Sequence, residues 1–502
     1  MKILVVSSEM VPFSKTGGLA DVAGALPKAL KELGHDTRVI IPKYKSDGKL
    51  GITAKLLLSG LEVQMGPEKR KANIYETKIQ GDVIVYLVEN EFFEREGLYQ
   101  EGGRDYPDNA ERFIFFCKAA LSLIKAIGWE PHVIHANDWQ TALIPAYLKT
   151  MLSKDMFYNT IAAVYTIHNM GYMGIFPAEK MPVTGLGWEY FTPDTMEFWG
   201  NICFSKAGIV YSDVINTVSE TYASEIQTEE FGHGLDGLVR SRVADVYGIL
   251  NGVDYEVWDP KTDKNLKKHY SSSDLRGKAA NKTMLRKSCG LSQKKDAPII
   301  GMVSMLTDQK GFDILSGCFD EIMLSGAQFV ILGTGDPKYH DLFTSYAKKY
   351  PGQISVNLGF DSAAAPLIYA GSDMFLMPSK YEPCGLGQLI SFKYGTIPVV
   401  RATGGLADTV FDIDADPQKG NGFVFNDYTS AALLGVVKRA MLKYSSDKKA
   451  WSSTVKRVME YDYSWQTSAK KYVALYKKAI ENLRTKMYKS RFADNGAVKV
   501  KT

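Results

Sequence analysis

The sequence predicts an α/β protein built from two Rossmann-like domains, each with a doubly wound parallel sheet. Short apolar, β-branched runs alternate with helical patterns along both halves of the chain, as buried parallel strands and their crossover helices do. The hexapeptide TGGLAD occurs twice, at 16–21 and 403–408, each time between a strand-like and a helix-like run. Each copy predicts a glycine turn at the start of a helix. We expect the two halves to hold an anionic ligand in a cleft between the domains.

The expected elements follow this alternation in order. Apolar, β-branched runs predict strands in the first half at 2–9, 37–42, 83–89, 133–138, 162–169 and 214–219. Amphipathic runs between them predict helices at 19–34, 112–128 and 141–152. The second half restarts with strands at 297–306, 327–335, 354–360, 373–379 and 397–403, and ends with helices at 430–445 and 465–487. Because strand and helix alternate, we expect parallel pairing in both sheets.

The domain boundaries follow from the polar, lysine-rich stretch at 259–293, which separates the two series of strands. We predict an N-terminal domain over 1–255 and a C-terminal domain over 256–465. A helix at 466–490 and a tail at 491–502 complete the chain.

Composition narrows the class of protein. The 502 residues include 60 lysines and arginines against 56 acidic residues, a balance that argues against a nucleic-acid partner. Five scattered cysteines without a CxxC pair indicate neither a disulfide framework nor a zinc site. A strand-like run follows Met1 directly, and no apolar run of about twenty residues occurs. We therefore expect a cytoplasmic protein without a membrane partner.

Two lysines stand where a phosphate contact is expected. Lys15 comes directly before the first glycine pair, and Lys310 lies in the loop after the strand at 297–306. A cation beside the start of a helix adds to that end's preference for anions. From its loop Lys310 can meet Lys15 across the cleft. On its spacing alone, Lys15 fits a phosphate contact and an ordinary surface lysine equally well, because the string is neither a Walker loop nor GxGxxG.

Three polar residues stand at the C-terminal tips of predicted strands, the edge where open parallel sheets bind ligands. Asp138 ends the strand at 133–138, His168 lies at the end of the next, and Glu382 follows the strand at 373–379. Taken alone, His168 favours a hydrogen-bonded structural role, and Glu382 equally fits a charge that stabilises a helix start. Together the three residues predict a sugar site.

Several longer strings then appear together and in order. They are KTGGLADV (15–22), TIHNMGYMGIFP (166–177), GILNGVDYEVWDP (248–260), QKGFDIL (309–315), LGTGDP (332–337), PSKYEPCGLGQL (378–389) and RATGGLADTV (401–410). In these strings the chain resembles bacterial glycogen synthases and plant starch synthases, glycosyltransferase family 5. The resemblance runs from Met1 to about Trp465.

The resemblance implies a GT-B fold with its two domains facing across a cleft, and a last helix that returns to the N-terminal domain. It implies a retaining glucosyltransferase that moves glucose from ADP-glucose to the non-reducing end of an α-1,4-glucan, such as glycogen or a maltooligosaccharide. It also implies that no cofactor and no metal takes part. Two alternatives are a catalytically weak glucan-binding relative and a GT-B sugar-nucleotide epimerase.

The resemblance also implies roles for individual residues. The implied catalytic set is Lys15, His168, Lys310 and Glu382. The implied contacts to the donor and its sugar are Lys15, Gly17, Gly18 and Lys310 for the diphosphate, Asp21, Asp138, Asn169 and Asn251 around the glucose, Gly335 nearby, Gly359 and Phe360 for the adenine, and the turn Cys384, Gly385 and Leu386.

One residue departs from the pattern of the resembled family, which usually has an arginine phosphate ligand where Met305 stands. A thioether cannot replace a guanidinium as a ligand of a diphosphate. The alternatives are that another cation compensates, that the donor binds more weakly, or that the chain is a non-catalytic glucan binder.

Overall fold

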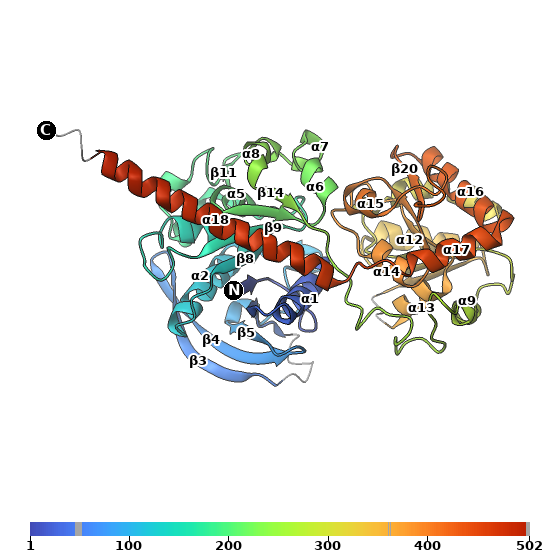
Figure 1. Cartoon of the computed structure of the whole chain (residues 1–502), viewed down its shortest axis with the longest axis horizontal. Helices are drawn as coiled ribbons and strands as arrows, with labels where there is room; N and C mark the ends of the chain where they lie inside the picture. The colour runs from blue at the N-terminus through green and yellow to red at the C-terminus, as the bar shows by residue number, and fades with distance from the viewer. Residues whose placement is uncertain (46–52, 360, 362, 498–502) are drawn as a thin grey trace. The chain divides into compact units, whose positions relative to one another are not determined.

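The computed structural model describes residues 1–45, 53–359, 361 and 363–497, and the chain forms two compact units (Figure 1). Unit 1 contains Met1–Val218, Ala223–Gly252 and the segment from Trp465 onward, and unit 2 contains Ser219–Tyr222 and Val253–Ser464. The first unit therefore ends slightly before the predicted boundary at 255. The backbone gives the reason: the N–H of Val253 donates to the carbonyl of Tyr463 at 2.7 Å, which ties this residue to unit 2.

Unit 1 is built on a nine-stranded sheet with the order β14-β13-β9-β8-β1-β2-β5-β4-β3. Its strands are β1 (Lys2–Val6), β2 (Asp36–Pro42), β3 (Lys55–Met65), β4 (Glu68–Ile79), β5 (Val83–Glu89), β8 (Val133–Asn137), β9 (Ala162–Ile167), β13 (Val214–Thr217) and β14 (Val246–Gly248). Pairing is parallel from β14 to β5, as predicted, but β4 pairs antiparallel with both β5 and β3. The sequence does not predict the β3–β4 hairpin, because both strands carry charged residues and bury only a few of their side chains.

Helices and short strands complete unit 1. The helices are α1 (Gly18–Glu32), α2 (Asn109–Ala126), α3 (Leu143–Lys149), α4 (Met181–Thr184), α5 (Phe204–Tyr211), α7 (Glu229–Gly232), α8 (Asp236–Ser241) and α18 (Trp465–Ala497), while α6 (Glu220–Glu225) spans the border of the two units. The short strands are β6 (Gln100–Glu101), β7 (Arg104–Asp105), β10 (Ile175–Pro177), β11 (Glu197–Phe198) and β12 (Asn201–Cys203).

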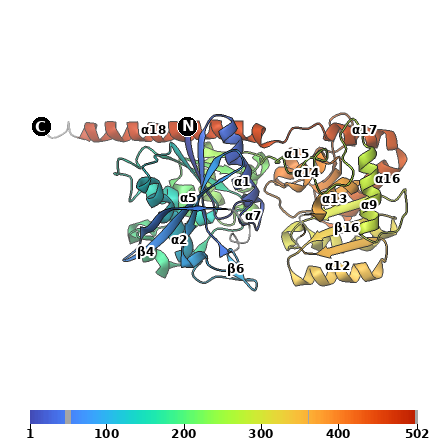
Figure 2. The ribbon, with the colours of Figure 1, turned by 90° about the horizontal axis from the view of Figure 1, so that it is seen from below.

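Unit 2 has a wholly parallel six-stranded sheet with the order β17-β16-β15-β18-β19-β20. Its strands are β15 (Ile299–Val303), β16 (Gln328–Gly333), β17 (Ile354–Leu358), β18 (Met374–Met377), β19 (Ile397–Arg401) and β20 (Phe423–Phe425). Its helices are α9 (Arg276–Ser288), α10 (Phe312–Ser316), α11 (Phe319–Leu324), α12 (Pro337–Lys349), α13 (Ala364–Gly371), α14 (Gly387–Lys393), α15 (Gly404–Thr409), α16 (Ser430–Ser446) and α17 (Lys448–Val458). Figure 2 shows α12 and α13 on opposite faces of this sheet, the doubly wound arrangement that the sequence predicts.

Each sheet reverses its strand order at one place. In unit 1 the first strand, β1, pairs with β2 on one side and with β8 on the other. In unit 2 the first strand, β15, pairs with β16 and with β18 in the same way. The loops that leave the two central strands diverge to opposite faces there, which leaves a crevice at the carboxyl ends of the strands. The fold therefore predicts one ligand-binding crevice in each unit.

The last helix, α18, lies along unit 1 against α1, β8, β9 and β13 (Figure 1). Its inward face is aromatic: Tyr472 and Tyr476 are fully buried, and the Tyr476 hydroxyl lies 3.0 Å from Nδ1 of His135 inside β8. The helix continues to Ala497, so the sequence prediction that it ends at 490 is wrong. Within the described residues, no helix is both long and apolar enough to span a bilayer.

Candidate functional site

The first crevice, in unit 1, begins with the loop that leaves β1. Lys15 lies in this loop, and its Nζ donates to both carboxylate oxygens of Asp21, at 2.7 Å and 2.8 Å. Asp21 stands in the first turn of α1, which Gly17 caps and Gly18 begins. A Cβ on Gly17 would find its nearest neighbour 3.8 Å away, at Glu9 Oε1. The space at this glycine is therefore open to a ligand.

A buried glutamate holds the same loop in place. Oε2 of Glu9 accepts hydrogen bonds from the backbone N–H of Thr16 at 2.5 Å and from its hydroxyl at 2.7 Å. Glu9 is not among the functional residues predicted from sequence, because the predicted strand runs over 2–9, whereas β1 ends at Val6. The only sign in the sequence that the strand ends before Glu9 is the string SSEM, which directly follows Val6, the last β-branched residue of β1.

The loops after β8 and β9 form the other wall of this crevice. Asp138 directly follows β8 and has a left-handed backbone with φ of 54°. Its Oδ1 accepts from the backbone N–H of His168 at 2.7 Å, which joins the tips of the two strands. Nε2 of His168 lies 2.9 Å from Oδ1 of Asn137. Because the Asn137 amide nitrogen donates to two carbonyls, its oxygen faces the ring as an acceptor, and His168 carries its proton on Nε2.

Burial sets the charges of this crevice. Desolvation raises the pKa of Glu9 to about 7, and it raises the pKa of Asp138 to about 7 as well, with the nearby charge of Glu9 adding to the shift of Asp138. Desolvation lowers the pKa of His168 to about 3, so the imidazole is neutral at pH 7. The Nδ1 atom of a neutral, Nε2-protonated ring is a hydrogen-bond acceptor, suited to a sugar hydroxyl.

Two asparagines complete the predicted residues of unit 1. Asn251 follows β14 and is buried, and its Oδ1 has no hydrogen-bond partner in the described structure. An unpaired buried carbonyl is costly, so it is a ready acceptor for a ligand hydroxyl. Asn169 instead uses its Oδ1 to accept from the N–H of Gly171 at 2.9 Å, which fixes the bend after β9.

The second crevice, in unit 2, contains an ion pair at the switch point. Nζ of Lys310, in the loop after β15, lies 2.7 Å from Oε2 of Glu382, in the loop after β18. The hydroxyl of Ser379 donates to the same oxygen at 3.0 Å. Both charged side chains are largely buried. The strand-order reversal thus brings together two residues of the catalytic set that the resemblance implies, although the sequence does not predict that these two pair with each other.

The second TGGLAD copy supports the turn that carries Glu382. The N–H of Gly405 donates to the carbonyls of Glu382 and Pro383 at 3.1 Å each. Gly404 has φ of 44°, and a Cβ there would lie 2.0 Å from the carbonyl oxygen of Glu382. Glycine is required here by close backbone approach. Cys384 is buried in this turn, where it packs and does not face solvent.

The remaining predicted residues of unit 2 lie at the same sheet edge. Gly385 is left-handed, with φ of 70°, and Leu386 caps α14. Gly335 packs closely on the loop after β15, because a Cβ would lie 2.4 Å from the carbonyl oxygen of Leu306. Gly359 follows β17. Phe360 lies outside the described residues.

Met305 is 46% exposed in the loop after β15. No hydrogen bond of its side chain is recorded in the described structure. Arg401, at the end of β19, donates from Nη1 to the carbonyl of Lys380 and from Nε to that of Asn426. Across the described ranges, no group of three or more His, Cys, Asp or Glu side chains could hold a metal ion.

Comparison with known proteins agrees with this geometry. Residues 2–241 match the family model of the starch synthase catalytic domain, and residues 288–457 match that of the glycosyl transferases group 1. Glycogen synthase of Syntrophotalea carbinolica is 47% identical over 96% of this chain and 99% of its own length, and glycogen synthase of Geotalea uraniireducens is 49% identical with the same coverage. This chain belongs to the glycogen synthase and starch synthase family.

As a member of that family, the protein is a glycosyltransferase enzyme. A solved structure of the catalytic domain of starch synthase IV from Arabidopsis thaliana, bound to ADP and acarbose, superposes with a TM-score of 0.90 at 34% identity. The match covers 95% of this chain and 99% of that one. The similarity confirms the GT-B fold that the sequence predicts.

The titration of Glu9 generates the first prediction. Folding raises the pKa of Glu9 from 4.5 to about 7, so the unfolded chain gives up this proton at a lower pH than the folded protein does. The folded protein therefore loses stability as the pH rises from 4.5 to about 7. Glu9→Gln stays neutral at every pH. We expect the Tm of Glu9→Gln minus that of the unsubstituted protein to be higher at pH 8 than at pH 5.5 by roughly a few degrees. Thermal unfolding at both pH values measures it.

Glu230→Gln, an exposed position on α7, is the matched control and should give the same small Tm difference at both pH values. An equal difference for Glu9→Gln at pH 5.5 and pH 8 would contradict the assigned shift.

The two TGGLAD copies generate the second prediction, from the same position in each. Gly404→Ala places a Cβ against backbone at a left-handed φ, so we expect a loss of about 1–3 kcal/mol in the free energy of unfolding. Gly17→Ala meets only open space and should unfold within about 1 kcal/mol of the unsubstituted protein. Denaturant unfolding compares the two variants. Equal stability of both would show that the second copy does not brace the Glu382 turn.

Proposed function

We propose that this enzyme transfers glucose from ADP-glucose to the non-reducing end of an α-1,4-glucan, and that the Lys310–Glu382 pair is the centre of its donor site. The pair is the observation that carries the proposal, because it places a cation and a carboxylate at the switch point, where nucleotide-type ligands bind in such sheets. The names of the relatives and the ADP in the solved starch synthase structure support this choice of donor.

In the proposed reaction the bond between glucose and the diphosphate lengthens, and negative charge develops on the leaving ADP. Lys310 would stabilise this charge, and Lys15 with the N-terminal end of α1 would do the same from unit 1. Without ligand each ammonium is paired with a carboxylate, Lys310 with Glu382 and Lys15 with Asp21. A diphosphate would compete for the lysines and leave both carboxylates as acceptors for sugar hydroxyls.

The neutral His168 serves the sugar in this proposal. Its Nε2 proton is held by Asn137, so Nδ1 would accept a glucose hydroxyl. Asp138 fixes the backbone of His168, and Asn251 offers its unpaired Oδ1 to another hydroxyl. Two lysines and backbone N–H groups supply the positive potential, so we propose that no metal ion and no cofactor takes part. Activity unchanged by EDTA is the expected outcome.

The direct test incubates the protein with ADP-glucose and glycogen and follows both ADP release and polymer growth. We expect equal amounts of ADP and of newly incorporated glucose. An altered sugar nucleotide without polymer would indicate an epimerase, and binding of glycogen without either product would indicate a glucan-binding protein.

Removal of the unit 2 cation tests the role of Lys310. Lys310→Met keeps the length of the side chain and removes the charge, so we expect kcat to fall about 10²–10³-fold, as for other donors to developing negative charge. Lys348→Met, an exposed position on α12, is the matched control and should retain full activity. Steady-state kinetics measure both. A Lys310→Met enzyme with at least half the original kcat would refute the assignment.

Substitution of Met305 tests whether the donor site would gain from an additional cation. Met305 is exposed and its side chain has no recorded polar partner, so Met305→Arg adds a guanidinium at little cost to the fold. A charge-assisted hydrogen bond to the diphosphate should tighten ADP binding about tenfold. Calorimetric titration of ADP measures it, with Leu324→Arg on α11 as the control. Unchanged or weaker affinity for ADP would contradict the idea that the donor site is short of a cation.

A further inference from the structure

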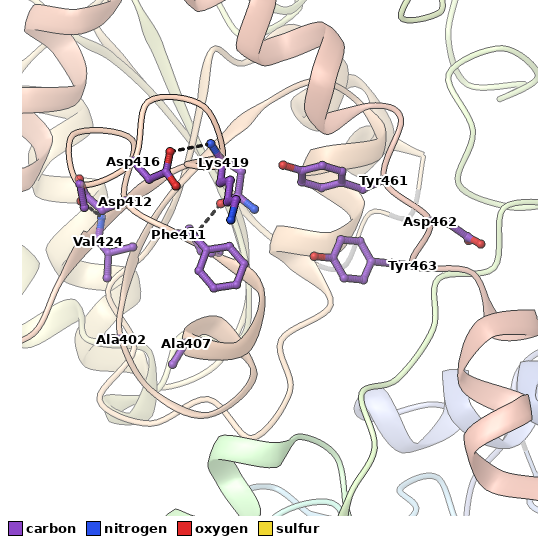
Figure 3. A pocket seen from close by; sticks show the side chains of 13 residues that line it. Ala402, Ala407, Phe411, Asp412, Asp416, Lys419, Val424, Tyr461, Asp462 and Tyr463 are labelled. Carbon is purple, nitrogen blue, oxygen red and sulfur yellow. Dashed lines mark hydrogen bonds between the residues drawn. The ribbon is translucent and has the colours of Figure 1, made fainter. Parts of the chain in front are cut away.

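Unit 2 contains a second hollow, lined by residues other than Lys310 and Glu382. Its volume is about 760 Å³, within the range of roughly 300–1,000 Å³ typical of small-molecule sites. One wall is the loop 410–421 between α15 and β20, and the other is the segment 461–463 before α18 (Figure 3). Ala402, Ala407, Val410 and Val424 also line the pocket and make part of its lining apolar. No step of the proposed reaction uses these residues.

Aromatic side chains dominate the pocket. Phe411 is 52% exposed, although the exposure of an apolar phenylalanine ring to water is unfavourable. Figure 3 shows the hydroxyl ends of Tyr461 and Tyr463 directed across the pocket toward Phe411 and Lys419. The tyrosine rings are held from behind by Phe392, which stacks on Tyr463 at 5.9 Å between ring centroids and meets Tyr461 edge-on at 5.6 Å. The pocket is therefore a rigid aromatic frame.

Among the polar side chains that line the pocket, Asp412, Asp416 and Asn421 are already hydrogen-bonded, whereas three other groups in the described structure are not. Neither tyrosine hydroxyl has a recorded hydrogen-bond partner in the described structure, and the same holds for Nζ of Lys419. Burial raises the pKa of Tyr463 to about 12, so its hydroxyl keeps its proton and can both donate and accept. Asp462 points away from the pocket (Figure 3). The hollow thus offers two hydroxyls and one ammonium at the edge of an apolar surface.

The charges around the pocket argue against an anionic ligand. Arg439 is bound to Asp412 and Asp414, and Arg457 donates to the carbonyl of Gly420. Lys419 is accompanied by Asp416, whose pKa is lowered by hydrogen bonds from backbone N–H groups, Lys419 first, so that it is ionised at neutral pH. A phosphate site needs several converging donors of positive charge. A neutral ligand with apolar faces and a hydroxylated rim fits this arrangement better.

We propose that this pocket binds a short stretch of α-glucan, apart from the donor site. A pyranose ring has apolar C–H faces that pack on aromatic rings, and hydroxyls at its rim that hydrogen-bond to groups such as the Tyr461 and Tyr463 hydroxyls and Lys419. The choice of an α-glucan over other neutral sugars rests on the proposed function. A polymer can occupy the pocket and the acceptor site of the same enzyme, which raises the effective concentration of its chain ends. A trisaccharide can occupy only one of them at a time.

The test separates the long acceptor from the short one. Phe411→Ala removes the exposed ring, and Tyr461→Phe with Tyr463→Phe removes only the hydroxyls and keeps the packing on Phe392. For both variants we expect the KM for glycogen to rise about threefold to tenfold, with kcat and the kinetics on maltotriose unchanged. Leu442→Ala, an exposed apolar position on α16, is the control and should change neither acceptor.

Retardation in native gels that contain glycogen measures glucan binding without catalysis. We expect Phe411→Ala to migrate faster than the unsubstituted protein and than Leu442→Ala. Unchanged retardation together with an unchanged KM for glycogen would overturn the proposal, as would a loss of ADP affinity in Phe411→Ala, which would indicate a nucleotide pocket. If the unsubstituted protein released no ADP from ADP-glucose, the proposed function would fail, but the gel would still decide on the pocket.

Discussion

The reversal of strand order beside the first strand of each sheet is the constraint on which the rest of this structure depends. Consecutive parallel strands are joined by crossovers. Where the crossovers of two neighbouring strands lead in opposite directions, as they do from β1 and β8 in unit 1 and from β15 and β18 in unit 2, a crevice opens at the carboxyl edge. Lys15 and Asp138 stand at this edge in unit 1, and Lys310 and Glu382 stand at it in unit 2. Residues far apart in the chain become neighbours because of strand order alone.

At these sheet edges, the ion pairs and protonation states of the site residues are ones that a bound ligand can change. Each lysine is paired with one carboxylate, and Glu9 and Asp138 are buried enough to hold a proton near neutral pH. A fixed cation without a partner would be costly to bury, and one that was paired irreversibly could not receive a phosphate. The observed pairs avoid both extremes, since a single carboxylate is a partner that a diphosphate can displace.

The sequence predicts what strand periodicity and strand tips determine, and little beyond. Apolar, β-branched runs predict the central parallel strands, and the rule that polar strand tips face a crevice predicts Asp138, His168 and Glu382 as site residues. The β3–β4 hairpin was not predicted from sequence. It lies at one end of the sheet and carries charged residues, so no regular alternation of apolar and polar residues marks its strands.

Two residues that hold site residues in place were also not predicted from sequence. Glu9 and Asn137 carry no motif of their own. Their importance comes from what they touch, Thr16 in one case and the ring of His168 in the other. Contacts of this kind depend on where one loop passes another, which a single sequence does not record.

The repeated TGGLAD shows the same limit from within one chain. Both copies lie at the start of a helix after a parallel strand, but their backbones differ: Gly17 caps α1 with φ of −145°, whereas Thr403 caps α15 and the equivalent Gly404 has φ of 44°. Their surroundings then separate them: Asp21 in the first copy binds Lys15, whereas Asp408 in the second accepts hydrogen bonds from the N–H and hydroxyl of Thr221. Gly17 faces open space, and Gly404 is pressed against the backbone of Glu382. A motif read from sequence therefore indicates where a helix begins, and the neighbours supplied by the fold decide the conformation of its glycines and whether that helix start receives a ligand or supports the residue that does.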